Sequence, residues 1–362
     1  MDIEVTRAAL DRVRTAEPVA GALADGDARL RIERFALSTN NVTYAVFGDL
    51  MRYWEFFPAA DGWGRIPVWG FGSVVESRCP GVAPGVKVFG YFPMSTQLRT
   101  TPGRVDASGF TDLAPHRQAM ASVYNRYQRV DTDPVYRPDL EELQMLLYPL
   151  FFTAFLVDDF LVANADFDAE QLVLSSASSK TALGVAFQAR ARSRRVVGLT
   201  SPSNAEFLEG LGVYDEVIAY DRAPTELVST GATPSTFVDV AGNRDVLMAV
   251  HQCLGERLQY SMTVGATHWD HVTGSDDELP GPHPTFFFAP SHIAERTKQW
   301  GRAVLGDRLG VAWTAFAAWV PNWLQIERVT GAEAVTDAYR DLLRGRADPR
   351  VGYICALGDG RQ

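Results

Sequence analysis

The segment Leu172–Arg190 combines residue types that bind an anion with a pattern that would position them. Apolar residues from Leu172 predict a buried strand, and an amphipathic helix is predicted from Thr181 to Ala191. Hydroxyl and ammonium groups occupy the turn between them, from Ser176, Ser178, Ser179, Lys180 and Thr181. Such groups hydrogen-bond phosphate oxygens, and a helix N-terminus attracts negative charge. The turn is therefore a candidate phosphate site.

The composition of this turn argues against a standard dinucleotide-binding loop. Such a loop carries glycines that let the backbone approach a pyrophosphate, and here the first glycine is Gly184, inside the predicted helix. The Ser-Lys-Thr run is similar to the end of a P-loop, but Leu174 stands where its first glycine would be. Two readings stay open: a substituted phosphate cradle, or a polar turn that no longer binds a nucleotide.

The elements around this turn divide the chain into two kinds of structure. Up to residue 145 the sequence predicts mostly strands, such as Leu30–Leu37 with its alternation of apolar and polar residues. Two further strands, Ile66–Arg78 and Val86–Phe92, flank a pair of Pro-Gly turns. Short strands with frequent turns favour a partly open β-barrel.

From Pro138 the pattern changes to an alternation of helices and strands. A helix is predicted over Asp139–Asp159. The predicted strands that follow are Leu172–Ser175, Arg195–Leu199, Glu216–Ile218, Ser235–Asp239 and Arg257–Val264, with helices Thr181–Ala191, Asn204–Leu211 and Arg244–Leu254 between them. This alternation predicts a doubly wound parallel sheet of the Rossmann type. Beyond Pro282 we expect a helix over Ser291–Leu305, a strand over Trp319–Glu327, a helix over Gly331–Arg344 and a strand over Val351–Leu357.

Composition and charge limit the class of protein and partner. The 362 residues exceed one ordinary core, so two lobes are expected. The net charge of −10 would repel nucleic acids and acidic membranes, which leaves a small molecule as the expected partner. Three widely spaced cysteines fit a reducing compartment. The N-terminus lacks a signal pattern and the apolar run Met145–Val157 is short and interrupted, so we expect a cytoplasmic protein.

The whole layout resembles the medium-chain dehydrogenase/reductase superfamily. The resemblance rests on Ile66–Val75 with Gly85–Gly90, on Phe152–Leu156, on Arg194–Asp221 and on the strand end Phe237–Gly242. It implies an α/β fold with a GroES-like, partly open β-barrel domain over residues 1–145 and a Rossmann domain over 146–284. Residues 285–362 would return to the GroES-like domain.

Within that superfamily the chain is most similar to the zinc-free quinone and enoyl reductases. It is closer still to a bacterial branch described only as a domain of unknown function, through Asn40–Asp49 and Phe286–Pro290. Zinc-dependent relatives bind the metal where this chain has Asn41 and Trp69-Gly70, and neither Trp nor Gly ligates zinc. His268, Asp270 and His271 are more typical of a solvated turn. We therefore expect no metal.

Reduction without a metal requires another group to polarise or protonate the substrate. The resemblance implies a tyrosine shortly after the first barrel loop, a place that Tyr53 occupies, with Tyr44 nearby; Asn41 is a candidate for orienting an oxyanion. Both tyrosines could instead be half-buried packing residues. A further segment, Ser122–Tyr127, would place Tyr124 and Tyr127 on one face if it is helical.

The resemblance also implies where a cofactor would lie. The glycine positions of the superfamily's phosphate turn fall on Ser179, Lys180 and Ala182. The second strand ends without the acidic residue that binds a free ribose 2′-hydroxyl, which favours NADP(H) over NAD. The expected binding residues are the turn residues given above, the 2′-phosphate candidates Thr200, Ser201, Ser203, Asn204 and Arg222, and the nicotinamide-facing Ala241, Gly242 and Gly265.

The sequence thus supports a first hypothesis and two rivals. The first is an NADPH-dependent, zinc-free reductase of an activated alkene, quinone or ketone. The second is a cofactor-free binding or scaffold protein on a degenerate dehydrogenase fold, and the third a site for an unusual nucleotide or acyl-thioester without hydride chemistry. By analogy with relatives, the sheet edge near Gln259–Thr267 would pair with a second copy in a homodimer.

Overall fold

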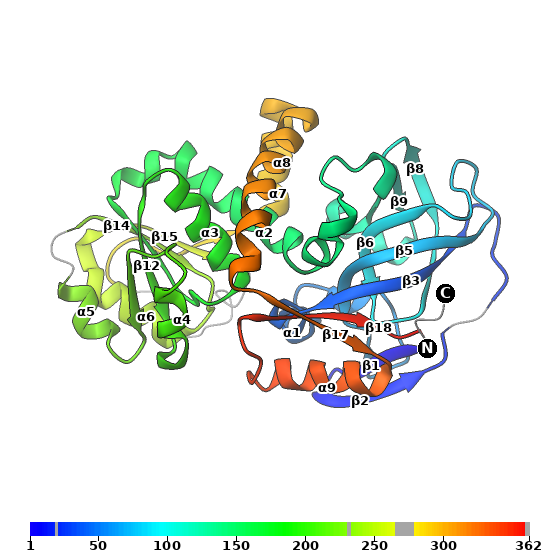
Figure 1. Cartoon of the computed structure of the whole chain (residues 1–362), viewed down its shortest axis with the longest axis horizontal. Helices are drawn as coiled ribbons and strands as arrows, with labels where there is room; N and C mark the ends of the chain where they lie inside the picture. Colours follow the sequence, from blue (N-terminus) through cyan, green and yellow to red (C-terminus); the bar gives the residue numbers. More distant parts are fainter. Residues whose placement is uncertain (19–20, 230–232, 265–278, 359–362) are drawn as a thin grey trace. The chain divides into compact units, whose positions relative to one another are not determined.

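The computed structural model describes residues 1–18, 21–229, 233–264 and 279–358 (Figure 1). It divides into two compact units, one made of Met1–Pro149 with Leu324–Gln362 and the other of Leu150–Trp323. The second boundary differs from the sequence expectation, because residues 285–323 belong to the second unit instead of returning to the first. The chain does return to the first unit, but from residue 324.

A nine-stranded sheet forms most of the first unit, in the order β17-β18-β3-β5-β6-β10-β9-β8, with β7 paired to β3. Its strands are β3 (Ala28–Leu37), β5 (Pro67–Ser77), β6 (Lys87–Pro93), β7 (Gln97–Thr100), β8 (Pro102–Asp106), β9 (Gly109–Asp112), β10 (Arg126–Arg129), β17 (Gln325–Thr330) and β18 (Val351–Ala356). β18 pairs antiparallel with β3, so the C-terminal strands complete the sheet that the N-terminal segment begins.

A smaller sheet and two helices complete the first unit. The sheet consists of β2 (Ala9–Ala16), β1 (Asp2–Thr6) and β4 (Trp63–Gly64), and the helices are α1 (Thr39–Val46) and α9 (Ala332–Leu343). The indole of Trp54, 2% exposed, fills the space beside Gly48 and Gly64. A Cβ at either glycine would come within 2.1 or 2.4 Å of that ring, so both positions require glycine.

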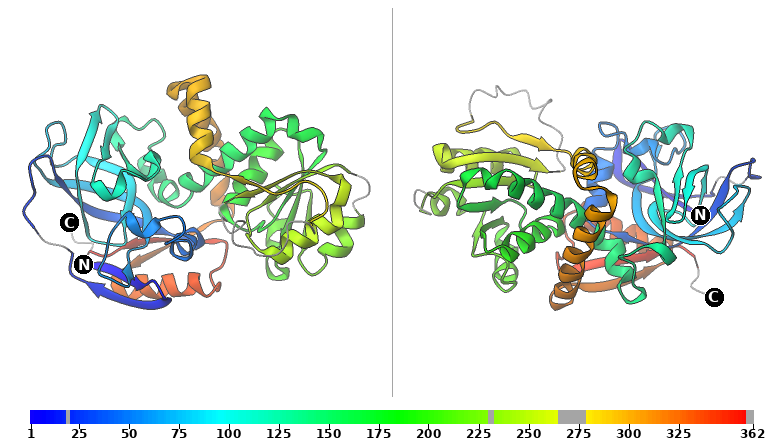
Figure 2. Two further views of the ribbon diagram at one scale, coloured as in Figure 1. Left: turned by 180° about the vertical axis from the view of Figure 1, so that it is seen from behind. Right: turned by 90° about the horizontal axis from the view of Figure 1, so that it is seen from above.

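The second unit contains a six-stranded parallel sheet in the order β13-β12-β11-β14-β15-β16 (Figure 2). The strands are β11 (Gln171–Leu174), β12 (Arg195–Thr200), β13 (Glu216–Ala219), β14 (Ser235–Asp239), β15 (Leu258–Val264) and β16 (Thr285–Phe287). The connecting helices are α3 (Lys180–Ala191), α4 (Ala205–Glu209), α5 (Ala223–Ser229) and α6 (Arg244–Leu254). The chain winds outward from β11 in one direction and from β14 in the other, which is the predicted Rossmann topology.

The predictions failed mainly after Pro282. Two helices, α7 (Ala289–Trp300) and α8 (Arg302–Trp319), replace the single predicted helix, because Gly301 adopts a left-handed φ of +79° between them. A strand is present, but β17 begins at Gln325 and not at Trp319, so the predicted start of this strand was wrong. Trp319, with which the predicted strand began, instead packs within the second unit, where its ring lies 5.3 Å from that of Phe187 between centroids. Tyr127 lies on strand β10, so it does not share a helical face with Tyr124.

Helix α2 (Glu141–Ala163) runs from the first unit into the second. The stretch Pro138–Ala163 is long and apolar enough to cross a membrane, with a mean hydropathy of 1.8, which differs from the expectation of a short, interrupted run. Of its most apolar window, 56% is buried inside the protein. Burial of this extent is also found in core helices of globular proteins.

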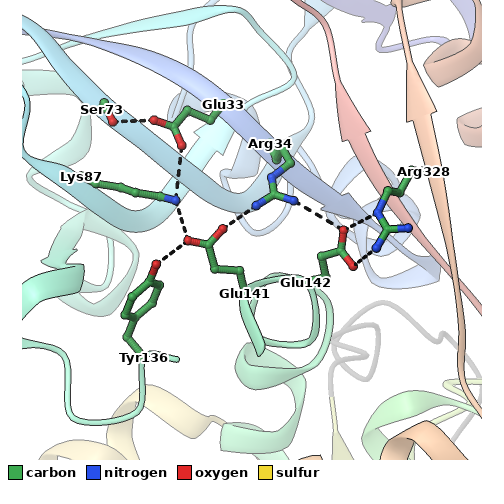
Figure 3. A network of polar contacts seen from close by, with 8 residues as sticks. All are labelled: Glu33, Arg34, Ser73, Lys87, Tyr136, Glu141, Glu142 and Arg328. Atoms are coloured by element: carbon green, nitrogen blue, oxygen red, sulfur yellow. Dashed lines mark hydrogen bonds and ion pairs between the residues drawn. The ribbon is translucent and has the colours of Figure 1, made fainter. Parts of the chain in front are cut away.

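A network of charges fixes the start of α2 within the first unit (Figure 3). Glu141 accepts hydrogen bonds from Lys87 at 2.5 Å and from the Tyr136 hydroxyl at 2.6 Å, and it also pairs with Arg34. Arg328 binds Glu142 through two hydrogen bonds of 2.7 and 2.8 Å. Acidic residues in a first helical turn are stabilised by the positive end of the helix dipole, so the network joins β3, β6 and β17 to a favourable helix terminus.

Candidate functional site

The predicted phosphate turn lies between β11 and α3 in the second unit, as the sequence indicated. Ser179 is the N-cap of α3, and its Oγ accepts a hydrogen bond of 3.2 Å from the N–H of Ala182. Ser176 adopts a left-handed backbone with φ +48°, a conformation that favours glycine. The turn therefore keeps a tight bend without any glycine.

Two tyrosines that the sequence analysis did not single out hold this turn. The Tyr220 hydroxyl accepts a hydrogen bond of 2.7 Å from the N–H of Ser176. The Tyr214 hydroxyl donates one of 2.7 Å to the carbonyl of Ala177. Tyr220 follows β13 directly, and the carboxyl ends of parallel strands share one sheet edge, so its position in the sequence could have indicated the contact.

The expected 2′-phosphate residues lie at the end of β12. Thr200 is buried, and the hydroxyls of Ser201 and Ser203 are 3.2 Å apart. The Asn204 amide donates to Ser178 Oγ at 3.0 Å, which joins this group to the phosphate turn. Arg222 instead forms an exposed pair with Glu226 at 3.0 Å, which partly neutralises its charge.

The ends of β11 and β14 are hydrogen-bonded to each other. Ser175 Oγ donates to Asp239 Oδ1 at 2.5 Å and accepts from the N–H groups of Val240 and Ala241 at 2.8 and 3.0 Å. The N–H groups of Ala241 and Gly242 also donate to Asp239 Oδ1, so the two predicted nicotinamide-facing residues bind this carboxyl group. Burial raises the pKa of Asp239, against the lowering effect of these donors. Gly265 lies outside the described residues.

The candidate proton donors lie in an aromatic cluster of the first unit. We define this cluster as Tyr44, Tyr53, Phe56, Phe57, Trp69, Tyr91 and Tyr124, contributed by α1, β5, β6, η1 (Tyr53–Glu55), η3 (Ser122–Asn125) and the two residues after η1. The ring centroids of Tyr44 and Tyr53 are 4.7 Å apart, and those of Tyr91 and Tyr124 are 5.0 Å apart. The sequence analysis missed Tyr91, which stands opposite Trp69 in the β5–β6 register.

The phenols of this cluster remain protonated at neutral pH. Burial raises the pKa of Tyr44 and outweighs the lowering influence of Trp69, Asn40 and Tyr91 around its hydroxyl. Burial also raises the pKa of Tyr53, which is half-buried, while the Tyr124 hydroxyl opposes the shift. Tyr44 is only 6% exposed. Both groups are therefore hydrogen-bond donors, and Tyr53 is the more accessible.

Asn41 has structural contacts at both ends of its side-chain amide. Its Oδ1 accepts a hydrogen bond of 2.8 Å from the N–H of Ser38, in the capping box of α1, and its Nδ2 donates to the carbonyl of Pro67 at 2.9 Å. These bonds connect α1 to the start of β5. The predicted contact of Asn41 with an oxyanion has no support in this geometry.

A buried arginine that the sequence analysis did not single out supports the aromatic cluster. Arg117, 1% exposed, pairs with Asp112 at 3.0 Å and donates to the Tyr127 hydroxyl at 2.9 Å. It also donates to the backbone carbonyl of Tyr124 at 2.7 Å. Because a buried cation is stable only when it is fully paired, these bonds fix the segment that carries Tyr124.

Within the described ranges, no group of three or more His, Cys, Asp or Glu side chains is placed to hold a metal ion. His268, Asp270 and His271 lie outside those ranges. Asn41 and Trp69 stand where zinc-dependent relatives are expected to bind the metal. The Asn41 amide is hydrogen-bonded at both ends, and the Trp69 indole belongs to the aromatic cluster.

Residues 35–348 match the sequence profile of a family described as "Protein of unknown function (DUF2855)". No curated protein sequence matches the chain.

Several solved structures share the fold. CurA from Vibrio vulnificus in complex with NADPH has 13% sequence identity and a TM-score of 0.63, over 96% of this chain and 95% of that chain. The CurK enoyl reductase has 13% identity and a TM-score of 0.57, over 99% of both chains. The yhdH oxidoreductase from Salmonella enterica in complex with NADP has 13% identity and a TM-score of 0.54, over 96% of this chain and 95% of that chain. At this level of identity the similarity establishes the fold alone.

Proposed function

The chain belongs to the DUF2855 family and has the medium-chain dehydrogenase/reductase fold, and from these premises we propose that it is an NADPH-dependent oxidoreductase. Its substrate would be an activated alkene, a quinone or a ketone, reduced without a metal. The observation that carries the proposal is the hydroxyl-rich N-terminus of α3 at the carboxyl edge of the parallel sheet. Ligands of such sheets bind at that edge, next to the point where the strand order reverses.

The donor set of the second unit fits a phosphorylated cofactor. Hydroxyls of Ser178 and Thr181 and the Lys180 ammonium cluster at the positive end of α3. The end of β12 presents Ser201, Ser203 and Asn204 without a carboxylate before Glu206, which suits a 2′-phosphate. The N–H of Ser176 is available to a phosphate only after it leaves Tyr220. Binding of a phosphate by this N–H group therefore requires one local rearrangement, in which the hydrogen bond between Ser176 and Tyr220 breaks.

When bound, NADPH would supply hydride to the substrate. The chain would supply the hydrogen-bond donor at the atom where negative charge develops, and Tyr53 is assigned this task because it is protonated and half-buried. Tyr44 is the second candidate. The surrounding rings of Phe56 and Tyr91 would exclude water from a flat, apolar substrate.

Related folds support this choice of cofactor. CurA and the Salmonella oxidoreductase were solved with NADPH and NADP respectively, and CurK is an enoyl reductase. The competing proposal, a cofactor-free binding or scaffold protein, is favoured by one observation: Tyr220 and Ser179 already satisfy two backbone N–H groups of the turn. In the third hypothesis, a nucleotide or acyl-thioester would bind at the same turn between β11 and α3, without hydride chemistry.

A binding measurement separates these proposals. Enhancement of NADPH fluorescence and a rise in Tm with NADP+ are expected, because a ligand at 100 times its Kd stabilises the folded state by about 2.7 kcal/mol. If millimolar cofactor causes neither the fluorescence enhancement nor the rise in Tm, the reductase is excluded and the scaffold protein is favoured. Cofactor binding without turnover of any enoyl thioester, quinone or aldehyde would favour the third hypothesis.

The cytoplasmic location, the small-molecule partner and the homodimer remain parts of this proposal. The acidic net charge of −10 supports the exclusion of nucleic acids and acidic membranes. Chromatography with light scattering at micromolar concentration measures the oligomeric state, and a monomer would contradict the dimer.

A further inference from the structure

Two buried oxygen atoms at the carboxyl edge of the parallel sheet have no hydrogen-bond partner among the described residues. They are Oδ2 of Asp239, the last residue of β14, and Oγ1 of Thr263, next to the last residue of β15. Both residues are 0% exposed. An unpaired buried polar atom is costly in free energy and rare in folded proteins. A ligand that bonds to both atoms would remove this cost.

The two atoms occupy one place on the sheet. Asp239 and Thr263 are paired in the parallel register of β14 and β15, so their side chains leave the same face of neighbouring strands. On its other side β14 adjoins β11, and between these two strands the strand order reverses. The unpaired atoms therefore lie beside the position where a sheet of this kind binds its ligand.

The carboxyl group of Asp239 has a fixed orientation. Its Oδ1 accepts from Ser175 Oγ at 2.5 Å and from the N–H groups of Ala241 and Gly242 at 3.1 and 3.3 Å. Because all three donors bind the same oxygen, Oδ2 is left as an acceptor. The Thr263 hydroxyl adds a donor next to it.

We propose that Asp239 Oδ2 and Thr263 Oγ1 bind a primary carboxamide. The amide N–H would donate to Asp239, and the amide carbonyl would accept from Thr263. An acceptor beside a hydroxyl that can donate is the complement of an amide edge. A carboxylate ligand would be repelled by Asp239, and an ammonium ligand would use the Thr263 oxygen only as an acceptor and leave the hydroxyl proton without a partner. The inference rests on the proposed function and deepens it, because it assigns this subsite to the carboxamide of the nicotinamide.

Binding measurements with three ligands distinguish the contact with Asp239 from the contact with Thr263. NADP+ carries the complete amide, its 3-acetylpyridine analogue keeps the carbonyl but replaces the NH2 with a methyl group, and 2′,5′-ADP has neither. Equilibrium Kd values are measured by calorimetry for the wild type, Asp239→Asn and Thr263→Val. Asparagine keeps an Oδ1 acceptor for the three donors of the carboxyl group, so this variant should fold. Thr236→Val is the matched control, because it removes a different buried hydroxyl of the same sheet, on β14, which bonds to the Asp166 carbonyl at 3.0 Å.

Each variant has its own expected pattern. Asp239→Asn should weaken NADP+ about tenfold and leave the acetylpyridine analogue unchanged, because only the NH2 contact is lost. Thr263→Val should weaken both about tenfold, since both carry the carbonyl. Neither variant should change the Kd of 2′,5′-ADP, and Thr236→Val should change none of the three.

Other results overturn the inference. If Asp239→Asn weakens NADP+ and its analogue equally, or if Thr263→Val affects neither, the amide does not bind here. Binding of 2′,5′-ADP and NADP+ without any such discrimination refutes this subsite and leaves the proposed function standing. If the wild type binds neither ligand, the proposed function fails and the subsite with it.

Discussion

At the residue scale, the phosphate turn shows how side chains can replace glycine. Ser176 takes the left-handed conformation that glycine usually supplies, at a cost of roughly 1 kcal/mol. Hydrogen bonds from its N–H to Tyr220 and from Tyr214 to Ala177 hold that conformation. In the proposed function, a hydroxyl cap and a cation would provide the phosphate contacts that a glycine loop provides with its bare backbone.

Lys180→Ala should weaken NADPH binding by roughly tenfold, because it removes a cation from the end of α3 that is expected to bind phosphate. Fluorescence titration measures the Kd. Arg190→Ala is the control, since Arg190 lies in the last turn of the same helix and pairs with Asp215 at the surface. An unchanged Kd for Lys180→Ala would remove the phosphate role of this lysine.

Tyr220→Phe should raise the affinity for NADPH while it lowers the free energy of unfolding by about 1 kcal/mol. The reason is that the N–H of Ser176 loses its internal acceptor and becomes available to a phosphate oxygen. Tyr214→Phe is the comparison, because it removes a donor to the Ala177 carbonyl and frees no N–H group. Equal effects of the two variants on the Kd would contradict the argument.

Tyr53→Phe should reduce turnover by about 100-fold and leave the Kd of NADPH unchanged, because a general acid contributes at least this factor and Tyr53 lies outside the second unit, which carries the proposed cofactor residues. Steady-state kinetics with the best substrate of an enone and quinone panel measure the loss. If Tyr44→Phe has the large effect and Tyr53→Phe has none, the donor role moves to Tyr44.

At the scale of elements, helix α2 carries two neighbouring carboxylates with opposite pKa shifts. Burial raises the pKa of Asp158 to about 6, although Arg192 binds it at 3.0 Å. Burial also acts on Asp159, but hydrogen bonds from His292 and Arg296 outweigh it and lower the pKa of that carboxyl group. One turn of helix α2 thus contains a carboxylate that folding destabilises, Asp158, and one that folding stabilises, Asp159.

The pH dependence of these two residues should differ in sign. A raised folded pKa means that the folded state binds the proton more tightly, so the contribution of Asp158 is present below pH 3.8 and is lost as the pH rises to about 6. Asp158→Asn should therefore add roughly 3 kcal/mol of stability at pH 8 and flatten the profile between pH 4 and 6. Urea denaturation across this pH range measures both effects.

Asp159→Asn is the matched control and should show the opposite behaviour. Its depressed pKa contributes stability above the unfolded value of 3.8, and this contribution disappears as the pH falls through the folded pKa. The variant should therefore be less stable than the wild type at pH 8, with the difference shrinking in acid. A stability gain for both variants at pH 8 would contradict the assignment of the shifts.

At the scale of the whole molecule, the net charge and one apolar helix give opposite indications about membrane binding. The net charge of −10 opposes binding to acidic lipid, while α2 is long and apolar enough to enter a bilayer. The half-buried window of α2 and the pairing of its first turn with Lys87 and Arg328 favour a helix of the protein interior. We expect less than about 5% of the protein to co-sediment with phosphatidylserine vesicles at 0.15 M salt. Substantial co-sedimentation in high salt would indicate insertion of α2.

Local patterns in the sequence determined the parallel sheet. The predicted strand Leu172–Ser175 is shifted by one residue from β11, and the predicted strand Arg195–Leu199 ends one residue before β12 does, because short apolar runs between helical periodicities have few alternatives. The same logic failed at Trp319, where the aromatic residues of a buried helix end have the composition of a strand. Helix α1 was not predicted, although the capping box of Ser38 and Asn41 is a local signal for its start.

The sequence by itself determined the fold class, the place of the phosphate turn and the absence of glycine and carboxylate around it, because these depend on residues close together in the chain. Only the tertiary structure decided which side chains meet there. Tyr220 reaches Ser176 across 44 positions, and Asp239 stands beside both Ser175 and Thr263 because parallel strands bring distant ends to one edge. Burial then decides the chemistry of these groups, since removal from water shifts a pKa or leaves an oxygen without a partner. Burial is a property of the packed chain that no local spacing specifies.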